Sequence, residues 1–413
     1  MAGARLLTRY PYNPVPEHGK LTLSSGVITD VTRLAGVEGD GAAYPDSSAG
    51  VWPAATNYIL NSNCATNANN IDSNASATVS RATDRYKFGG ASLKVLCPGL
   101  GGSEGANYRT AVGTAAPSDI RSAEIWVYHE ASGSLNFYVQ IAWRDSGGSA
   151  LSPTSGSSTA VAPFTWTRLT VTGTAPASTD RADVKAIKSS TSTDTFWVGG
   201  VQLETGSIAT PYIHTDGGTA SRSAGRIQMP ASVLDETQMW LTMRVRAGSA
   251  YNVGSGVLRL FQWQDSVTER LILQYVVGDK FYLDRDSGAG GSSASAALNF
   301  AAGDSYTVTG AFEAEASKIS VNGASFSSVA NSAIPTLAAS AADIGSISGT
   351  SGHLNGNALW VALGRGTLTD ADAALLHAFG NNRPLPHQFP KSADLRFLAH
   401  FYGDGTAYRY RAA

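Results

Sequence analysis

The sequence predicts an all-β protein made of two β-sandwich domains in series. Short runs of strand-forming residues alternate with Gly, Ser, Asn and Pro, and a single stretch near the C-terminus has a helical period. The chain has 413 residues, which suggests two or three domains of about 150 residues each. We expect an irregular N-terminal arm at 1–56, sandwiches at 57–215 and 216–384, and a C-terminal hairpin at 385–413.

Composition and charge exclude several classes of partner. Hydrophobic residues make up 43% of the chain, charged residues only 15%, and the formal net charge is -2. Such a surface carries no long-range field for phosphate backbones or anionic lipid, so we expect neither nucleic acid nor membrane insertion. No apolar run approaches the roughly 20 residues of a membrane span, and the N-terminus lacks the apolar segment of a signal peptide. We therefore expect synthesis in a cytoplasm without an export signal.

The N-terminal segment, 1–56, is rich in Pro, Gly and Asp and has one strand candidate at 20–31. A segment of this kind is usually ordered by something it packs against. It is either an arm that docks on another subunit or a leader that packs on its own domain, and the sequence favours neither.

The first sandwich shows clear alternation along 135–144. This alternation predicts one core face formed by Phe137, Val139, Ile141 and Trp143. In the strand that begins at 196, the same argument predicts one core face shared by Trp197, Gly199, Val201 and Leu203. Cys64 and Cys97 also fall in this domain, and in a reducing cytoplasm we expect two buried thiols rather than a disulfide.

The two ends of this domain carry a resemblance. The run FWVGGVQLETGSIATPYIHT at 196–215 resembles the last strand of a carbohydrate-binding-module-like jelly roll found in bacteriophage fibres and tail proteins. The run ATNYILNSNC at 55–64 resembles the opening of that module, and the stretch 42–62 resembles the linker that precedes it in phage head-spike and tail proteins. Relatives often hold a structural calcium ion through an Asp in the last strand. Gly199 or Gly200 stands there in this chain, so we expect no cofactor, with structural calcium as the open alternative.

The second sandwich is predicted from strands between 238 and 365, and it carries a second resemblance. The run SKISVNG at 317–323 is a strand that ends in an Asn-Gly turn suited to a type I′ hairpin. Together with LWVALGRG and a short Leu-Thr-Asp helix at 359–380, it resembles a laminin-G-like jelly roll of the concanavalin A type. The resemblance implies two jelly-roll β-sandwich domains in series.

The only predicted helix lies near 370–379. Thr369 is the expected N-cap with Asp372 three residues later, and Gly380 is the expected stop. After it, a Gly-Asp-Gly turn between two aromatic runs predicts a hairpin. Its aromatic residues are either an interface or a cover over their own domain, and we favour an interface made by Phe401, Tyr402, Tyr408 and Tyr410.

Glycan recognition requires aromatic platforms beside amide or hydroxyl groups. The best candidates lie opposite the predicted core face: Tyr138, Gln140 and Arg144, joined by Tyr128 if the two strands pair. For any one of these residues, simple coverage of an outer sheet face is about three times as frequent as a binding role.

Catalytic and metal signatures are weak. Glu313 and Glu315 lack the third acid of a concanavalin A-type glycosidase, so we expect no carboxylate pair. Asp284 and Asp286 could contribute to a cation site, but a polar turn explains them better because calcium needs about six oxygen ligands. The His residues form no metal-binding spacing. The sequence therefore predicts a protein that is not an enzyme.

Taken with the resemblances, these observations predict a non-enzymatic bacteriophage virion protein displayed on the particle surface as a fibre, spike or decoration. Its expected partners are other virion subunits, copies of itself, for which a trimer suits the setting, and host-surface polysaccharide. Two alternatives stay open. One is a capsid cement or decoration protein without glycan binding, and the other is a polysaccharide-degrading enzyme.

Overall fold

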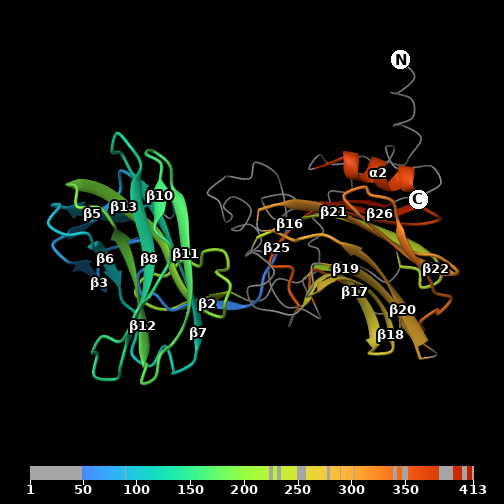
Figure 1. Cartoon of the computed structure of the whole chain (residues 1–413), viewed down its shortest axis with the longest axis horizontal. Helices are drawn as coiled ribbons and strands as arrows, with labels where there is room; N and C mark the ends of the chain where they lie inside the picture. The colour runs from blue at the N-terminus through green and yellow to red at the C-terminus, as the bar shows by residue number, and fades with distance from the viewer. Residues whose placement is uncertain are drawn as a thin grey trace, which may run out of the picture. The chain divides into compact units, whose positions relative to one another are not determined.

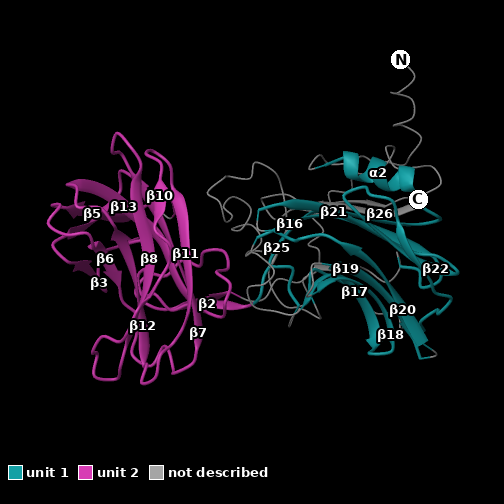
Figure 2. Ribbon diagram, in the orientation of Figure 1, with its two compact units in different colours: residues 1–38, 43–53, 223–413 teal, residues 39–42, 54–222 magenta. Residues whose placement is uncertain are grey.

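The computed structural model describes residues 49–88, 90–222, 227–229, 234–248, 257–276, 280–288, 290–301, 303–337, 342–346, 352–380, 394–401 and 407–411. They form two compact units, coloured separately in Figure 2. Unit 2 spans Ala54–Arg222, and unit 1 contains Ser223–Ala413 together with the strand at 49–51. Strands dominate both units, which confirms the predicted all-β fold class.

Unit 2 is a sandwich of two antiparallel sheets (Figure 1). One sheet has the order β10–β8–β12–β6–β3, with β9 also paired to β8, and the other has the order β11–β7–β13–β5–β4. β2 pairs with β14, so the chain enters and leaves this unit through adjacent strands. The strands are β2 (Ala55–Asn57), β3 (Ile71–Asn74), β4 (Thr78–Ala82), β5 (Ser92–Cys97), β6 (Glu104–Tyr108), β7 (Ile120–His129), β8 (Leu135–Arg144), β9 (Thr154–Ser155), β10 (Thr159–Val161), β11 (Thr167–Thr174), β12 (Arg181–Lys188), β13 (Asp194–Thr205) and β14 (Ala220–Arg222).

The core of unit 2 lies between these sheets. The predicted core face of β8 is confirmed, because none of its four side chains is more than 1% exposed: Phe137, Val139, Ile141 and Trp143. Cys64 and Cys97 are buried free thiols, as predicted. Burial raises the pKa of each thiol to about 12, so both stay protonated and unreactive near neutral pH.

β13 changes face at a β-bulge. Its pairing with β7 shifts register between Gly199 and Gln202, and the inserted residue inverts the alternation of side chains beyond it. The side chains that enter the core are Phe196 and Val198 before the bulge and Val201 and Leu203 after it. Trp197 therefore lies on the outer face, beside Tyr128. The predicted single core face that included Trp197 and Gly199 is wrong for this reason.

Unit 1 also contains two antiparallel sheets. One has the order β23–β22–β21–β16–β25–β26–β27, with β1 also paired to β25, and the other has the order β15–β24–β17–β18–β19–β20. The elements are β1 (Ala49–Val51), β15 (Ile227–Met229), β16 (Met239–Ala247), β17 (Val257–Ser266), β18 (Glu269–Val276), β19 (Lys280–Ser287), β20 (Gly290–Ala297), β21 (Ser305–Phe312), β22 (Ala316–Val321), β23 (Ser327–Ala330), β24 (Ala342–Ile344), β25 (Gly356–Arg365), α2 (Asp370–Ala378), β26 (Asp394–Phe401) and β27 (Ala407–Arg411).

Two segments that we placed outside the second domain belong to its sheet. β1, from the predicted arm, pairs with β25. The C-terminal hairpin forms as β26 and β27, but β26 continues the sheet by pairing with β25 instead of standing apart. Pairing with β25 gives β1 and β26 partners for their backbone hydrogen bonds. An isolated two-stranded hairpin would be only marginally stable in water. The rest of the arm before residue 49 lies outside the described residues.

Helix α2 has the predicted cap. The Thr369 hydroxyl accepts a hydrogen bond from the Asp372 backbone N–H, and the Asp372 carboxylate accepts one from the Thr369 backbone N–H at 2.7 Å. The helix packs through Leu376 against Trp240 and Trp360 on the outer face of its sheet. In the described part of the chain, no helix has the length and hydrophobicity required to cross a bilayer.

Loss of this cap should destabilise unit 1. We expect Thr369→Ala to lower its free energy of unfolding by about 1 kcal/mol, because the first turn of α2 loses the side-chain acceptor for a backbone N–H. Urea unfolding followed by tryptophan fluorescence measures the change, since Trp240 and Trp360 lie beneath the helix. Thr369→Ser keeps the acceptor and should change the stability by a few tenths of a kcal/mol. Equal losses in both variants would contradict the assigned cap.

Candidate functional site

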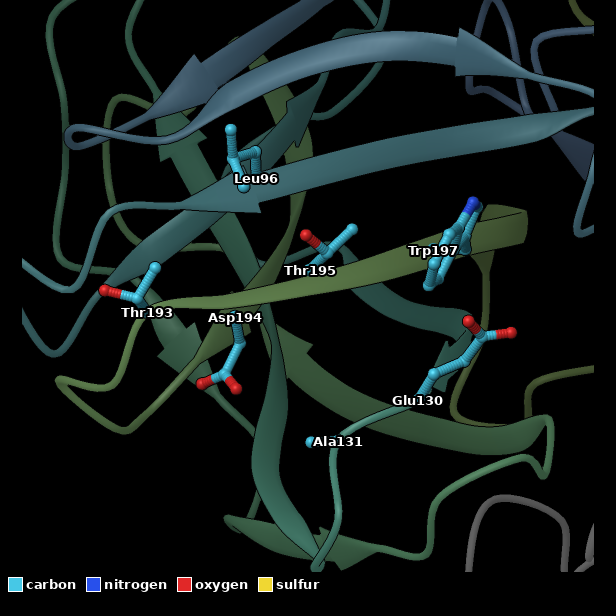
Figure 3. Close-up of a pocket in the computed structure, with 7 residues that line it drawn as sticks. All are labelled: Leu96, Glu130, Ala131, Thr193, Asp194, Thr195 and Trp197. Atoms are coloured by element: carbon cyan, nitrogen blue, oxygen red, sulfur yellow. The ribbon is translucent and has the colours of Figure 1, made fainter.

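A pocket opens on unit 2 where β5, β7 and β13 lie side by side (Figure 3). Its volume is about 290 Å³, close to the lower limit of small-ligand pockets. We call it the Glu130 pocket. It is lined by Leu96 from β5, Glu130 and Ala131 after β7, and Thr193, Asp194, Thr195 and Trp197 at the start of β13.

Strand pairing places the pocket on the outer face of its sheet. Thr195 pairs with Leu96, and Trp197 pairs with Tyr128. Paired residues share a face, and alternate residues of one strand do so too, so these side chains all project outward. The Asp194 side chain projects to the other face of the sheet, where its carboxylate accepts a hydrogen bond from the Lys188 ammonium at 3.1 Å. Asp194 therefore borders the pocket while its charge is held by a buried cation.

Aromatic residues form the wall behind the pocket. The ring centroid of Tyr128 lies 5.4 Å from that of Trp166 and 5.8 Å from that of Trp197. The Lys94 ammonium lies 5.6 Å from the Trp197 ring, which is within cation–π range. Trp197 is only 5% exposed, and its indole Nε1 has no hydrogen-bond partner among the described residues. This packing fixes the wall before any ligand arrives.

Glu130 is held in place by two neighbours through one of its oxygens. Arg85 Nε lies 2.5 Å from Oε1, and the Tyr128 hydroxyl donates to the same oxygen at 3.0 Å. The Arg85 hydrogen bond, more than any other cause, holds the pKa of Glu130 below its ordinary value. The second oxygen, Oε2, accepts no hydrogen bond from the described residues. The pocket thus presents a fixed, ionised acceptor.

The remaining lining groups are apolar or hydroxyl. Leu96 is 49% exposed, so its side chain offers apolar surface to solvent. The Thr193 hydroxyl donates to the Pro98 carbonyl oxygen at 3.0 Å, which leaves its oxygen as an acceptor. The arrangement suits a small ligand that combines an apolar face with hydrogen-bond donors.

The sequence-predicted glycan residues do not form one site. Tyr138, Gln140 and Arg144 lie on β8, on the outer face of the opposite sheet from the Glu130 pocket. Gln140 donates to the Ser155 hydroxyl at 2.9 Å, and Arg144 forms an ion pair with Asp183 at 2.9 Å.

Tyr128 does not join those residues, because β7 and β8 follow each other in sequence but belong to opposite sheets. The condition under which Tyr128 would join Tyr138, that the two strands pair, is therefore not met, and glycan binding by these residues stays a prediction. Tyr128 instead lies behind the Glu130 pocket. The Gly199-Gly200 pair is the sequence signal for the bulge in β13, since paired glycines inside a strand often mark a bulge. The pocket residues of this strand precede the bulge, and this signal does not identify them.

The candidate cation residues have protein partners. Asp286 forms an ion pair with Arg270 at 2.5 Å, and the Asp284 carboxylate accepts a hydrogen bond from Gln274 Nε2 at 2.5 Å. Across the described residues, no group of three or more His, Cys, Asp and Glu side chains is arranged to hold a metal ion. The polar turn predicted for these two acids is wrong, because both lie within β19, where Asp284 pairs with Ile272 and Asp286 with Arg270 of β18.

The predicted aromatic interface falls at the limit of the described residues. Phe401 ends β26, and Tyr408 and Tyr410 belong to β27. Tyr402 lies outside the described residues. The interface role of these four residues stays a prediction.

Comparison with known proteins gives similarity to solved structures only. No protein-family model and no curated protein sequence matches the chain. The C-terminal family 22 carbohydrate binding module of Clostridium thermocellum Xyn10B is 15% identical, with a TM-score of 0.31, over 36% of this chain and 93% of the module. A family 16 carbohydrate binding module is 17% identical, with a TM-score of 0.26, over 36% of this chain and 99% of the module.

Larger proteins match over a smaller share of their length. The chain spans 28% of a Clostridium thermocellum xylanase structure that joins a family 22 module to its GH10 module, at 14% identity and a TM-score of 0.31. It spans 21% of the enzymatically active domain of tailspike protein 4 of bacteriophage CBA120, at 16% identity and a TM-score of 0.28 over 36% of this chain.

Proposed function

We propose that this protein is a non-enzymatic structural protein of a bacteriophage virion, displayed on the particle surface, and that unit 2 attaches the particle to host-surface glycan. The observation that carries the glycan-binding part of the proposal is the Glu130 pocket, and the virion part rests on the resemblance of residues 55–64 and 196–215. The pocket combines exposed apolar surface at Leu96, a fixed carboxylate at Glu130 and hydroxyl groups on rigid strands. A sugar ring has the complementary features, with apolar C–H groups on its faces and hydroxyl groups around its rim.

The proposed binding is weak at each site and strong for the particle. A pocket of about 290 Å³ holds one sugar residue or two rather than a long chain. Several copies on one particle would raise the apparent affinity through avidity. The proposal therefore includes a homo-oligomer, for which we expect a trimer, synthesis in the host cytoplasm and residence in the virion.

The chemistry of the pocket favours binding over hydrolysis. Glycoside hydrolases generally use two carboxyl groups about 5–9.5 Å apart, one of which must be protonated to act as the acid. Arg85 lowers the pKa of Glu130, which makes that group a poor proton donor near neutral pH. The Asp194 carboxylate is directed to Lys188. These contacts support a protein that is not an enzyme.

The test of the virion role is the position of the chain in purified particles. Electron microscopy of particles with and without the protein, with copy number from quantitative mass spectrometry, should find it at the particle surface. A few copies at the tail tip would favour receptor binding, and a regular array over the capsid would favour the alternative of a decoration or cement protein. Absence from particles would contradict a virion role.

Binding by the pocket has its own prediction. We expect Leu96→Ala to weaken binding of purified full-length protein to host-surface polysaccharide about five-fold, because about 1 kcal/mol of apolar contact is removed. Biolayer interferometry with immobilised polysaccharide measures the change. Leu100→Ala is the matched control, since Leu100 is 78% exposed and does not line the pocket. Equal affinities for all three proteins would place binding elsewhere.

A further inference from the structure

We infer that the Glu130 pocket selects uncharged sugars and rejects acidic ones, and that Glu130 is the residue that makes the distinction. This inference rests on the proposed glycan-binding function and names the class of sugar. It starts from the charges on the pocket lining. Glu130 and Asp194 are its ionisable residues, and the Asp194 carboxylate is occupied by the buried Lys188 ammonium. The Asp194 side chain projects to the opposite face of the sheet, so the lining presents one carboxylate to the outer face, that of Glu130. The Lys94 ammonium lies 5.6 Å from the Trp197 ring and is not part of the lining.

The positive charge beside Glu130 does not reverse this. Arg85 is bound to Glu130 Oε1 through Nε and to the Asp84 carbonyl oxygen through Nη1. Arg85 is not part of the pocket lining. Arg85 keeps Glu130 ionised and oriented through Oε1. The other carboxylate oxygen, Oε2, accepts no hydrogen bond from the described residues.

Hydrogen-bonding capacity points in the same direction at Glu130 and Thr193, whereas the Thr195 hydroxyl can both donate and accept. An ionised carboxylate oxygen only accepts, and the Thr193 oxygen is left as an acceptor because its hydroxyl donates to Pro98. Sugar hydroxyl groups can donate to both. The carboxylate of a uronic acid, a sulfate or a phosphate brings acceptors alone and a like charge, so it would leave Oε2 unsatisfied and be repelled.

The position of Glu130 depends on Tyr128. The Tyr128 hydroxyl donates to Oε1 at 3.0 Å, and the ring is 9% exposed between Trp166 and Trp197. The carboxylate is thus anchored to the rigid aromatic wall rather than carried on a free side chain. A fixed acceptor discriminates better than a mobile one because less side-chain entropy is lost on binding.

The test uses full-length protein and an array of neutral hexose oligosaccharides paired with the matching uronic acid oligosaccharides. We expect the neutral member of a bound pair to bind at least about ten-fold more tightly than the acidic member. Glu130→Gln removes the charge and keeps the size, and it should reduce this ratio to about three-fold or less. Asp84→Asn is the matched control, because it removes a neighbouring acid that does not line the pocket, and it should leave the ratio unchanged.

Two contrary results have different meanings. Binding of neutral and acidic members with equal affinity, or a ratio that Glu130→Gln leaves unchanged, would overturn the selectivity and leave glycan binding in place. Failure of every member to bind at millimolar concentration would overturn the glycan-binding function and the selectivity with it. Circular dichroism of Glu130→Gln confirms that the variant is folded.

Discussion

Replacing Arg168 with methionine is expected to destabilise unit 2 by about 3–5 kcal/mol, the range for breaking a buried ion pair from one side. Arg168 Nε lies 2.9 Å from Glu124 Oε2 on the neighbouring strand, and the Glu124 side chain is 1% exposed. Arg168 also donates to the Ala209 carbonyl oxygen at 3.0 Å. Methionine fills similar volume but removes the ion pair of the buried Glu124 carboxylate, which keeps its hydrogen bond with Trp126, and removes the hydrogen bond to this carbonyl.

Urea unfolding of the full-length variant at pH 7 measures the loss. Arg81→Met is a matched control, since Arg81 is exposed and bonds backbone carbonyl groups rather than a carboxylate. Adding Glu124→Gln to Arg168→Met should recover a large part of the loss because the buried Glu124 carboxylate that lost its ion pair is then absent. A loss of less than about 1 kcal/mol, or no recovery in the double variant, would mean that the pair contributes little.

The stability of unit 2 should also fall as the pH rises from about 4.5 to 7. Glu204 is buried, and burial raises the pKa of its carboxyl group from 4.5 to about 7 despite hydrogen bonds from Thr210 and Gln202. Between these values the folded protein holds a proton that the unfolded chain has released. The contribution of the Glu204 carboxyl group to the free energy of unfolding is therefore complete below pH 4.5. About 3 kcal/mol of it is lost as the pH rises to 7.

The measurement is a series of urea unfolding curves of unit 2 between pH 4.5 and 7, compared with the same series for Glu204→Gln. The variant has no proton to lose at this position. Its free energy of unfolding should therefore fall by about 3 kcal/mol less than that of the unmodified protein between pH 4.5 and 7. Parallel curves for the two proteins would exclude a raised pKa at Glu204.

The sequence-based predictions were correct where the structure is set by neighbouring residues, as in the alternation of side chains along a strand, a helix cap or a turn. The core face of β8 was predicted correctly because large apolar residues recur at every second position from Leu135 to Trp143. The helix was predicted because Thr369 and Asp372 act on each other within one turn. The Asn-Gly turn after β22 was predicted from local conformation, and both Asn322 and Gly323 have positive φ, as a type I′ turn requires. The expected two-residue hairpin is not formed, because β23 begins only at Ser327 and its innermost pair with β22 is Ile319 with Ser327.

The candidate site depended on features that no local pattern contains. The bulge in β13 reversed the side of Trp197, and the crossing from β7 to β8 separated Tyr128 from Tyr138. Glu130 is positioned by Arg85, which is 45 residues away in sequence. Long-range pairing of this kind is set by tertiary packing, which sequence period does not report.

The pairing of β1 with β25 and of β2 with β14 makes unit 2 an insertion within unit 1. A domain whose two ends are neighbouring strands can be exchanged as a cassette, because any replacement with closely spaced ends would restore the same connection. Unit 1 needs the strand at 49–51 from one side of the cassette and the residues after 222 from the other, so its sheet is completed only after the whole insertion has been synthesised. On the proposed function, a phage lineage could thus acquire a new glycan preference by recombination at residues 54 and 222 without redesigning the unit that carries the cassette.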